Sequence, residues 1–484
     1  MSLAVCLIAS EVAPLAKTGG LADVAAALTK QLHTEGHDAR LFMPFYSSIE
    51  RAHLEHFAIE FLKDVPLQLG PHQYQYSVVT ARLPESRVFL YLVDCPALYA
   101  RTRLYTEDVD EHLRFLVLTH AALESCRRMD WSPNILHCHD WHTAFGPLLL
   151  KSKYRADRLL ARTKSVLTIH NIGYQGVFPA AAAAAVGLGA QTDLLQQDDL
   201  RAGYVNSLKH GILFADAITT VSPTYAREIR TAEYGMGLQG ALSLRGDAVL
   251  GILNGADYDH WDPRSDRYLP RHYGPRELAV KAELKREFLA RLRLKADPRT
   301  PLIGLVARLT AQKGLEVLFD SLPALLARRD VCFVAVGSGE QRYESFFAEL
   351  QQQFPLRAVF RRGYSEELAH WVEAASDLFV MPSRYEPCGL NQMYSMRYGT
   401  VPIVRNTGGL ADSVHHYDPI TRRGTGIVFN DFNSEAMSWA LDTALDLYEQ
   451  PEVWRDIMRQ GMAENFSWER QGALYMQLYR RLVG

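Results

Sequence analysis

Short runs of β-branched and other apolar residues alternate with amphipathic stretches along the whole chain. The apolar runs predict strands at 4–9, 88–93, 135–138, 165–169, 217–221, 302–306, 331–336, 378–381 and 402–404. Apolar residues recur at helical spacing in the segments 21–33, 113–127, 315–327 and 390–398. Alternating strands and helices predict an α/β protein whose parallel sheets are covered by helices on both faces.

A break in this pattern near residue 250 predicts a domain boundary. Segment 251–270 is rich in turn residues, and a charged amphipathic stretch at 281–294 leads into the next strand. A chain of 484 residues is also too long for a single hydrophobic core. We expect two Rossmann-like domains, at 1–248 and 249–466, facing each other across a deep cleft. A final helix is predicted at 467–484.

Composition narrows the class of protein. Hydrophobic residues make up 48% of the chain, charged residues 22%, and the formal net charge is −3. The chain has no surplus of basic residues that would indicate a nucleic acid or an anionic membrane as a partner. No apolar run reaches the roughly 18–20 residues that span a bilayer. The six cysteines form no CxxC pair, and the first ten residues lack the basic start of a signal peptide. A soluble cytoplasmic enzyme or binding protein is expected.

The hexapeptide TGGLAD occurs twice, at 18–23 and at 407–412. In the first copy, Gly19 and Gly20 allow a close approach to the backbone, and the N–H groups of the next turn attract an anion. Lys17 adds a positive charge before this turn, and Asp23 lies in the first helical turn. A phosphate or diphosphate site and a simple tight turn are both compatible with this stretch.

Two histidine-containing stretches follow predicted strands. ILHCHDWHTAF (135–145) holds three histidines and Asp140, but no second cluster completes a metal site. A polar cluster that binds sugar hydroxyls is the favoured interpretation. In TIHNIGYQGVF (168–178), His170 and Asn171 either orient a polar ligand or are ordinary buried groups.

Charged residues in the second half indicate a site for a leaving phosphate. Arg308 and Lys313 lie at a strand–loop–helix junction, where two cations suit a pyrophosphate that gains charge as a bond breaks. Glu386 precedes Pro387 at the start of a predicted helix, where a carboxylate with only a local role is the alternative. Cys388 has no nearby histidine in this stretch, so we expect it to pack rather than to act as a nucleophile.

Taken in order, these motifs resemble the bacterial glycogen synthase and plant starch synthase family. The resemblance rests on SEVAPLAKTGGLADV, HCHDWHTA, IHNIGYQG, RLTAQKG and PSRYEPCGLNQMYSMRYGTVPIVRNTGGLADSV, and it spans most of the chain. Members are ADP-glucose-dependent retaining glucosyltransferases with the GT-B fold. The resemblance therefore implies transfer of glucose from ADP-glucose to the non-reducing end of an α-1,4-glucan such as glycogen. It also implies that the final helix completes the first domain.

The resemblance assigns roles to individual residues. Arg308 and Lys313 match the pair that holds the donor diphosphate, Glu386 matches the essential carboxylate near the glucosyl group, and Asp140 and His170 match polar residues around the transferred glucose. The residues that match the donor-binding positions are Lys17, Gly19, Gly20, Asp23, Asn254, Arg308, Lys313, Tyr364, Cys388, Gly389, Thr407, Gly408 and Gly409. Tyr364 is expected against the adenine.

Two departures from related patterns affect the expected mechanism. Many retaining GT-B enzymes carry E-x7-E, but Tyr394 stands at the second position, which favours a same-face substitution over a double displacement. Segment 104–118 is shorter than is usual in the family. No metal or pyridoxal phosphate is expected, because lysine and arginine supply the positive charge. A UDP-glucose-dependent transferase, a glycan phosphorylase and a non-catalytic glycan-binding protein are the alternatives.

Overall fold

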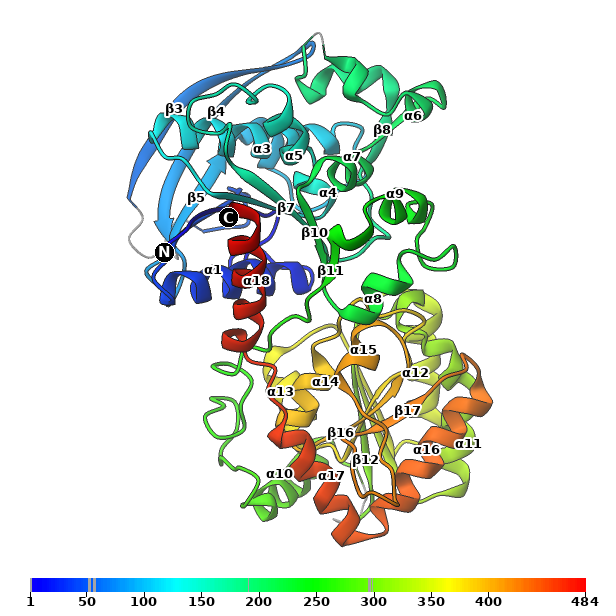
Figure 1. Ribbon diagram of the computed structural model, residues 1–484. Helices are drawn as coiled ribbons and strands as arrows, with labels where there is room; N and C mark the ends of the chain where they lie inside the picture. Colours follow the sequence, from blue (N-terminus) through cyan, green and yellow to red (C-terminus); the bar gives the residue numbers. More distant parts are fainter. Residues whose placement is uncertain (1, 51–53, 55–57, 190, 295–296, 298) are drawn as a thin grey trace. The chain divides into compact units, whose positions relative to one another are not determined.

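The computed structural model describes residues 2–50, 54, 58–189, 191–294, 297 and 299–484. The chain divides into two compact units (Figure 1). The first unit comprises Met1–Gly255 together with Trp468–Gly484, and the second comprises Ala256–Ser467. The sequence pattern placed the two boundaries at residues 248 and 466.

Among the described residues, the large sheet of the first unit has the strand order β11-β10-β7-β6-β1-β2-β5-β4-β3. These strands are β1 (Ala4–Ile8), β2 (Asp38–Pro44), β3 (Ala58–Leu69), β4 (His72–Arg82), β5 (Phe89–Asp94), β6 (Ile135–His139), β7 (Lys164–Ile169), β10 (Ala217–Thr220) and β11 (Val249–Gly251). From β11 to β5 all neighbours are parallel, so their carboxyl ends share one edge. The strand order reverses between β1 and β6, as expected for a Rossmann-like domain.

The expectation of purely parallel sheets is wrong at one edge of the first unit. β3 pairs antiparallel with β4, and β4 pairs antiparallel with β5. The chain between β3 and β4 turns at Gly70, whose φ of 56° lies in the left-handed region that glycine tolerates best. A turn this short can connect only antiparallel neighbours, since a parallel pair needs a long crossover.

The first unit also contains helices, most of which connect the sheet strands, and a separate two-stranded hairpin. The helices are α1 (Gly20–Thr34), α2 (Pro96–Tyr99), α3 (Glu111–Arg128), α4 (Asp140–Thr143), α5 (Phe145–Lys151), α6 (Gln197–Arg201), α7 (Ser207–Phe214), α8 (Pro223–Glu228), α9 (Gln239–Leu244) and α18 (Trp468–Val483). The hairpin consists of β8 (Val177–Pro179) and β9 (Tyr204–Asn206). α18 lies beside α1, where Gly472 faces the Gln31 side chain (Figure 1).

The sheet of the second unit is entirely parallel among the described residues, with the order β14-β13-β12-β15-β16-β17. Its strands are β12 (Leu302–Val306), β13 (Cys332–Gly337), β14 (Ala358–Arg362), β15 (Leu378–Met381), β16 (Val401–Arg405) and β17 (Ile427–Phe429). The order reverses between β12 and β15, which is the Rossmann pattern. Here the prediction of a parallel sheet is confirmed.

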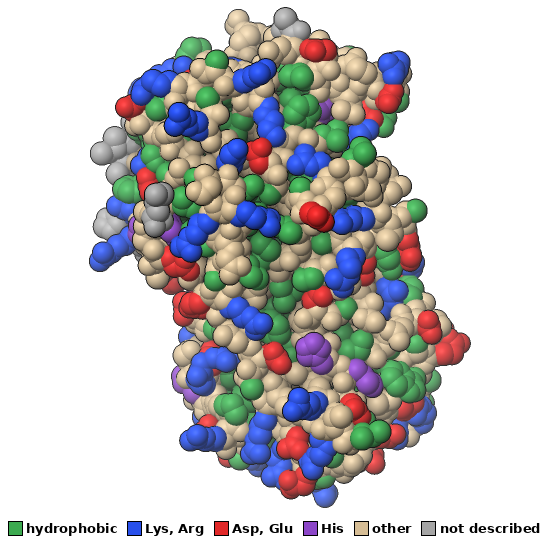
Figure 2. Space-filling model, in the orientation of Figure 1, with side chains coloured by type: hydrophobic (Ala, Val, Ile, Leu, Met, Phe, Trp, Pro, Cys, Tyr) green, Lys and Arg blue, Asp and Glu red, His purple; other side chains and the backbone are tan. Residues whose placement is uncertain are grey.

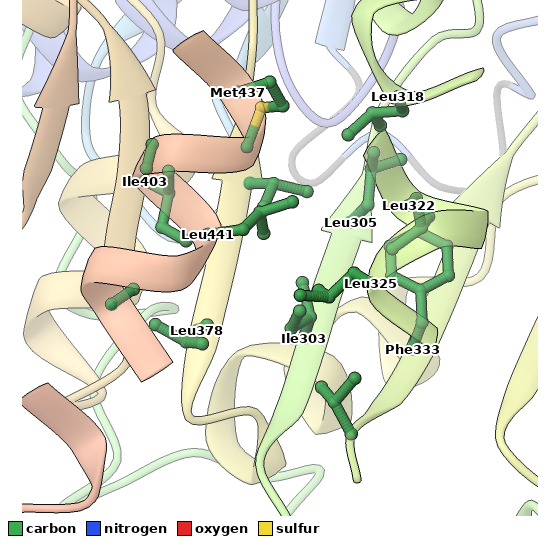
Figure 3. Close-up of a cluster of buried hydrophobic side chains, with 14 of the residues drawn as sticks. Ile303, Leu305, Leu318, Leu322, Leu325, Phe333, Leu378, Ile403, Met437 and Leu441 are labelled. Carbon is green, nitrogen blue, oxygen red and sulfur yellow. The ribbon is translucent and has the colours of Figure 1, made fainter. Parts of the chain in front are cut away.

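Helices pack on this sheet through regularly spaced apolar residues. They are α10 (Leu278–Arg291), α11 (Leu318–Arg328), α12 (Gln341–Gln353), α13 (Glu366–Ala375), α14 (Asn391–Arg397), α15 (Gly408–Ser413), α16 (Ser434–Tyr448) and α17 (Pro451–Ala463). Leu318, Leu322 and Leu325 recur at helical spacing on α11 and point toward Ile303 and Leu305 of β12 (Figure 3). This core fixes the strands whose ends carry the candidate site.

The outer surface carries charges of both signs. On the face in Figure 2, Lys and Arg side chains are interspersed with Asp and Glu. Within the described residues, none of the helices is both long and apolar enough to cross a membrane.

Candidate active site

In both units, some of the candidate residues follow the two strands at which the strand order reverses. In the first unit, the loop with Lys17 follows β1, and Asp140 follows β6. In the second unit, Lys313 follows β12, and Glu386 follows β15. Ligands of open α/β sheets bind at this position, because the two adjacent loops diverge there.

A buried carboxylate that the sequence interpretation missed holds the Lys17 loop. Glu11 accepts hydrogen bonds from the backbone N–H groups of Thr18 and Gly19 and, at 2.7 Å, from the Thr18 hydroxyl. Tyr105 also donates to Glu11, so the short segment 104–118 is attached to this loop. Glu11 therefore occupies the N–H groups of Thr18 and Gly19, which come just before the first turn of α1.

Lys17 itself lies at the surface and can change partner at low cost. Its Nζ is 2.7 Å from Oδ1 of Asp23, and half of its side chain is exposed. Exposed ion pairs of this kind contribute about 0–1 kcal/mol. A β-carbon added at Gly19 or Gly20 would meet nothing within 4 Å. Packing therefore does not require these two glycines, and the space beside them is open to a ligand.

The histidines after β6 and β7 form one buried group. The rings of His137 and His139 lie 4.3 Å apart, as expected for side chains on one face of a strand. Nδ1 of His139 and Nε2 of His170 are 3.0 Å apart. The Tyr479 hydroxyl of α18 lies 2.7 Å from Nδ1 of His137, so the last helix helps to orient this group.

Burial keeps these histidines neutral. It lowers the pKa of His139 and of His142 to about 3, and it lowers the pKa of His137 and of His170 well below the usual value. In the described part of the chain, no group of three or more His, Cys, Asp or Glu residues could hold a metal ion. Neutral imidazoles suit hydrogen bonds to uncharged hydroxyl groups.

Asp140 is the first residue of α4, and it is hydrogen-bonded to the chain at His170. Its Oδ1 accepts the backbone N–H of His170 at 2.6 Å and the backbone N–H of Asn171 at 3.4 Å. Burial raises the pKa of Asp140 to about 7, while the two N–H groups act in the opposite direction. A carboxyl group with this pKa can accept or donate a hydrogen bond near neutral pH.

In the second unit, Lys313 and Glu386 form an ion pair. Nζ of Lys313 lies 2.6 Å from Oε2 of Glu386, and the Ser383 hydroxyl donates to the same oxygen at 2.9 Å. The Glu386 side chain is 6% exposed and that of Lys313 is 21% exposed. Glu386 is therefore not merely a helix-entry carboxylate, since its charge is matched by a lysine from the other side of the reversal point.

Arg308 and Tyr364 lie at the same edge of this sheet but project outward. Arg308 follows β12 and is exposed, and among the described residues its guanidinium forms no ion pair. Tyr364 follows β14 and is 68% exposed. A guanidinium is suited to an anionic ligand group, and an exposed aromatic ring is suited to a planar one.

The second TGGLAD copy is packed much more tightly than the first. The Gly409 N–H donates to the Glu386 backbone carbonyl at 3.0 Å, and a β-carbon at Gly409 would lie 2.2 Å from the Cys388 carbonyl oxygen. Gly408 has a φ of 45°, and Thr407 precedes it at the start of α15. Cys388 is buried, as expected for a packing residue.

Gly389 forms part of the same turn. Its φ is 72°, and its backbone carbonyl accepts a hydrogen bond from the Gln392 side chain at 3.0 Å. Residues with a side chain disfavour this left-handed conformation, whereas glycine adopts it readily. The turn thus fixes the backbone that carries Glu386.

Opposite stability effects are expected for alanine at the two TGGLAD copies. Gly20→Ala places a β-carbon in open space at the start of a helix, so the free energy of unfolding should stay the same or rise by up to about 1 kcal/mol. Gly409→Ala drives a β-carbon into the Cys388 backbone. This substitution should lower the free energy of unfolding by at least about 1–3 kcal/mol. Urea denaturation measures both, and equal losses would contradict the packing difference.

Three further side chains, Tyr394, Asp108 and Asp110, have structural partners. Tyr394, at the second position of the E-x7-E pattern, stacks on Trp261 with ring centroids 4.3 Å apart. Asp108 and Asp110 pair with Arg101 at 2.8 and 2.6 Å, so they hold segment 104–118. These contacts account for all three side chains without a ligand.

Asn254 lies at the end of the first unit and is buried. Among the described residues, its Oδ1 atom finds no hydrogen-bond partner. A buried amide oxygen without a partner costs about 1–3 kcal/mol, so a ligand or water bond there is favourable.

Comparison with known proteins places these features in a family. The model of the starch synthase catalytic domain matches residues 4–244, and the model of glycosyl transferases group 1 matches residues 289–461. A glycogen synthase from Koribacter versatilis is 41% identical over 99% of this chain and 98% of its own length. A glycogen synthase from Anaeromyxobacter dehalogenans is 43% identical over 99% of both chains.

The chain belongs to the glycogen synthase and starch synthase family. The catalytic domain of starch synthase IV from Arabidopsis thaliana, solved with ADP and acarbose, superposes with a TM-score of 0.91 at 34% identity and covers 100% of both chains. A sucrose-phosphate synthase from Thermosynechococcus elongatus matches at 17% identity with a TM-score of 0.61, which shows the fold alone. The predicted GT-B fold with two Rossmann-like domains is confirmed.

Two features of this family member were not predicted from its sequence. Glu11 stands in the SEVAPLAKTGG motif directly after a strand, and that position was the available signal for a loop-capping carboxylate. Ser383, three residues before Glu386, carried no signal, because serine is common in loops for many reasons.

Proposed function

We propose that this glycogen and starch synthase family member transfers glucose from ADP-glucose to the 4-hydroxyl at the non-reducing end of an α-1,4-glucan. The configuration at the anomeric carbon is retained. The observation that carries the proposal is the ion pair between Lys313 and Glu386 at the reversal point of the second sheet. Bond cleavage in a nucleotide sugar creates negative charge on phosphate and positive charge on the sugar ring, and this pair offers one group for each.

The leaving phosphate is assigned to Arg308 and Lys313. Both follow β12, and Arg308 is exposed at the carboxyl edge without an ion pair in the described chain. Two cations at this edge can stabilise the charge that develops on the departing ADP, and Lys313 is already held there by its ion pair with Glu386. With lysine and arginine in this role, no metal or pyridoxal phosphate is needed, which stays a prediction.

The sugar is assigned to Asp140, His170 and Glu386. Asp140 accepts the backbone N–H of His170, and the two side chains are suited to bind hydroxyl groups of glucose. Glu386 either stabilises positive charge on the ring or positions a hydroxyl group. Since Tyr394 is occupied by stacking on Trp261, a same-face substitution remains the proposed route.

The remaining donor contacts are proposed from position and exposure. The open space at Gly19 and Gly20 supports a close approach of the donor phosphates beside Lys17. Tyr364 is proposed to stack on the adenine, which its exposed ring permits. Asn254 has a buried oxygen that a donor hydroxyl can satisfy.

Transfer of labelled glucose decides the proposed function. ADP-glucose and UDP-glucose are each supplied with glycogen, and the linkage in the product is checked with an enzyme that cleaves only α-1,4 bonds. We expect incorporation from ADP-glucose to exceed that from UDP-glucose. Preferential use of UDP-glucose would refute the donor, and no incorporation from either sugar would refute the transferase.

Lys17→Ala should weaken donor binding without affecting folding. We expect the KM for ADP-glucose to rise about tenfold, which corresponds to about 1.4 kcal/mol. The melting temperature should not change, because the exposed pair with Asp23 contributes little. Lys164→Ala is the matched control, because it removes an exposed lysine at the amino end of β7, away from the carboxyl ends that carry the candidate residues. An unchanged KM in Lys17→Ala would show that the loop is only a turn.

A further inference from the structure

An exposed apolar surface in the first unit begins next to the candidate site. Four large apolar side chains, each between 36% and 56% exposed, belong to the loop after β7, the β8–β9 hairpin and the loop before α9. They are Tyr174, Val177, Tyr204 and Met236. We call these four residues the loop surface. Exposed apolar groups gathered in this way mark ligand or partner sites more often than single exposed residues do.

One side chain joins the segments that carry the loop surface. Nε2 of Gln175 donates to the Met236 carbonyl at 2.9 Å, and Oε1 of Gln175 accepts from Nδ2 of Asn206 at 2.7 Å. The hairpin register places Val177 opposite Asn206. Because all three segments are tied together before any ligand arrives, binding there needs little ordering of the protein.

The backbone holds Met236 outward in a strained conformation. Met236 has a φ of 47°, which is uncommon for a residue with a side chain, and Gly237 follows with a φ of 89°. Such a conformation persists only where the surroundings enforce it, and it is concentrated at binding sites. The carbonyl bond to Gln175 is one such constraint.

The chemistry of the loop surface is uncharged. Segments 171–179, 203–208 and 234–240 contain no Asp, Glu, Lys or Arg, although 22% of the whole chain is charged. The polar groups between the apolar ones are amides, such as Gln175 and Asn206. A phosphate or a nucleic acid needs cations that these segments lack. Apolar faces with neutral donors and acceptors instead match a glucose ring, which carries apolar C–H faces and hydroxyl groups.

The loop surface begins a short distance along the chain from the candidate site. The His170 and Asn171 N–H groups both bond to Asp140, and the Asn171 carbonyl accepts from the Tyr174 N–H at 3.2 Å. Only two residues therefore lie between Asn171 and Tyr174, the first ring of the surface. The first ring of the surface is therefore close in the chain to the backbone that Asp140 holds.

We propose that the loop surface binds glucosyl units of the acceptor α-glucan behind the reacting end. This inference rests on the proposed function, because that function supplies the glucan. Tyr174 and Tyr204 provide ring faces, Met236 provides an adaptable apolar contact, and the neighbouring amides bind hydroxyl groups.

The test uses Tyr174→Ala and Met236→Ala, separately and combined, with Tyr204→Ala as a third variant. Binding of maltoheptaose is measured by calorimetry without donor, and the KM for glycogen and for ADP-glucose by transfer assays. We expect the combined variant to bind maltoheptaose at least fivefold more weakly and to show at least a fivefold higher KM for glycogen. The KM for ADP-glucose should stay within twofold.

Phe89→Ala is the matched control, because Phe89 is an exposed aromatic residue at the amino end of β5, where it packs against Arg82. It should change neither binding nor KM. Maltoheptaose affinity within twofold of the wild type in the combined variant, with an unchanged melting temperature, would overturn the proposal. So would a wild-type dimer that the combined variant converts to monomer, since a second copy would then occupy the surface.

The binding measurement separates this proposal from the proposed function. If the wild type binds maltoheptaose and the combined variant does not, the loop surface binds glucan even where no glucose is transferred. If transfer occurs but binding is unaffected by the variants, the transferase stands and the loop surface proposal fails.

Discussion

Lys313→Ala is expected to lower kcat by about 10²–10³-fold, because it removes a fixed positive charge from the site assigned to the leaving phosphate. Its folding should suffer as well. Glu386 is 5% exposed and would keep only Ser383 as a partner for its charge, a loss of about 1–3 kcal/mol in the free energy of unfolding. Steady-state kinetics with saturating donor and urea denaturation measure the two effects.

Arg308→Ala separates the catalytic effect from the structural one. Arg308 is exposed and forms no ion pair among the described residues, so its loss should lower kcat by a similar factor with the melting temperature unchanged. Arg328→Ala, which removes a surface arginine paired with Asp442, should leave kcat unchanged. If both Arg308→Ala and Lys313→Ala keep kcat within threefold of the wild type, electrostatic stabilisation of the leaving group is wrong.

Glu386→Gln should lower kcat by about 10²–10³-fold while the protein stays folded. The amide oxygen still accepts the Ser383 hydroxyl, but the negative charge that balances a positive sugar ring is gone. Binding of ADP should not weaken, since the leaving-group cations remain. Transfer assays give kcat, and calorimetry gives the ADP affinity.

Glu373→Gln is a close control for that substitution. Glu373 of α13 is also a buried glutamate of the second unit, and its Oε2 accepts the Ser395 hydroxyl at 2.6 Å. Burial raises the pKa of Glu373 to about 8, so its carboxyl group is mostly protonated at pH 7 and glutamine changes no charge. Its kcat should match the wild type. A Glu386→Gln variant within fivefold of wild-type kcat would exclude a charge-based role for Glu386.

Local sequence patterns predicted most of the elements that carry the site. The strand expected at 302–306 is β12, and the helix expected at 21–33 lies within α1. Their apolar spacing is a local property that tertiary contacts reinforce. The pattern missed β2, β3, β4, β8, β9, β11, β14 and β17. β3 and β4 lie at the sheet edge and no helix separates them, so an alternation of strands and helices does not mark them. It also could not show that Glu11 caps the Lys17 loop.

The sequence by itself determined the α/β class, the presence of two TGGLAD turns and the residues whose motifs resemble those of the family. Only the tertiary structure decided what each of them touches. The two TGGLAD copies are identical in letters, yet Gly20 faces open space while Gly409 lies against the Cys388 backbone. Lys313 and Glu386 are 73 positions apart and meet because β12 and β15 are neighbours. Strand order sets such contacts, and it depends on the packing of the whole domain rather than on the residues next to each site.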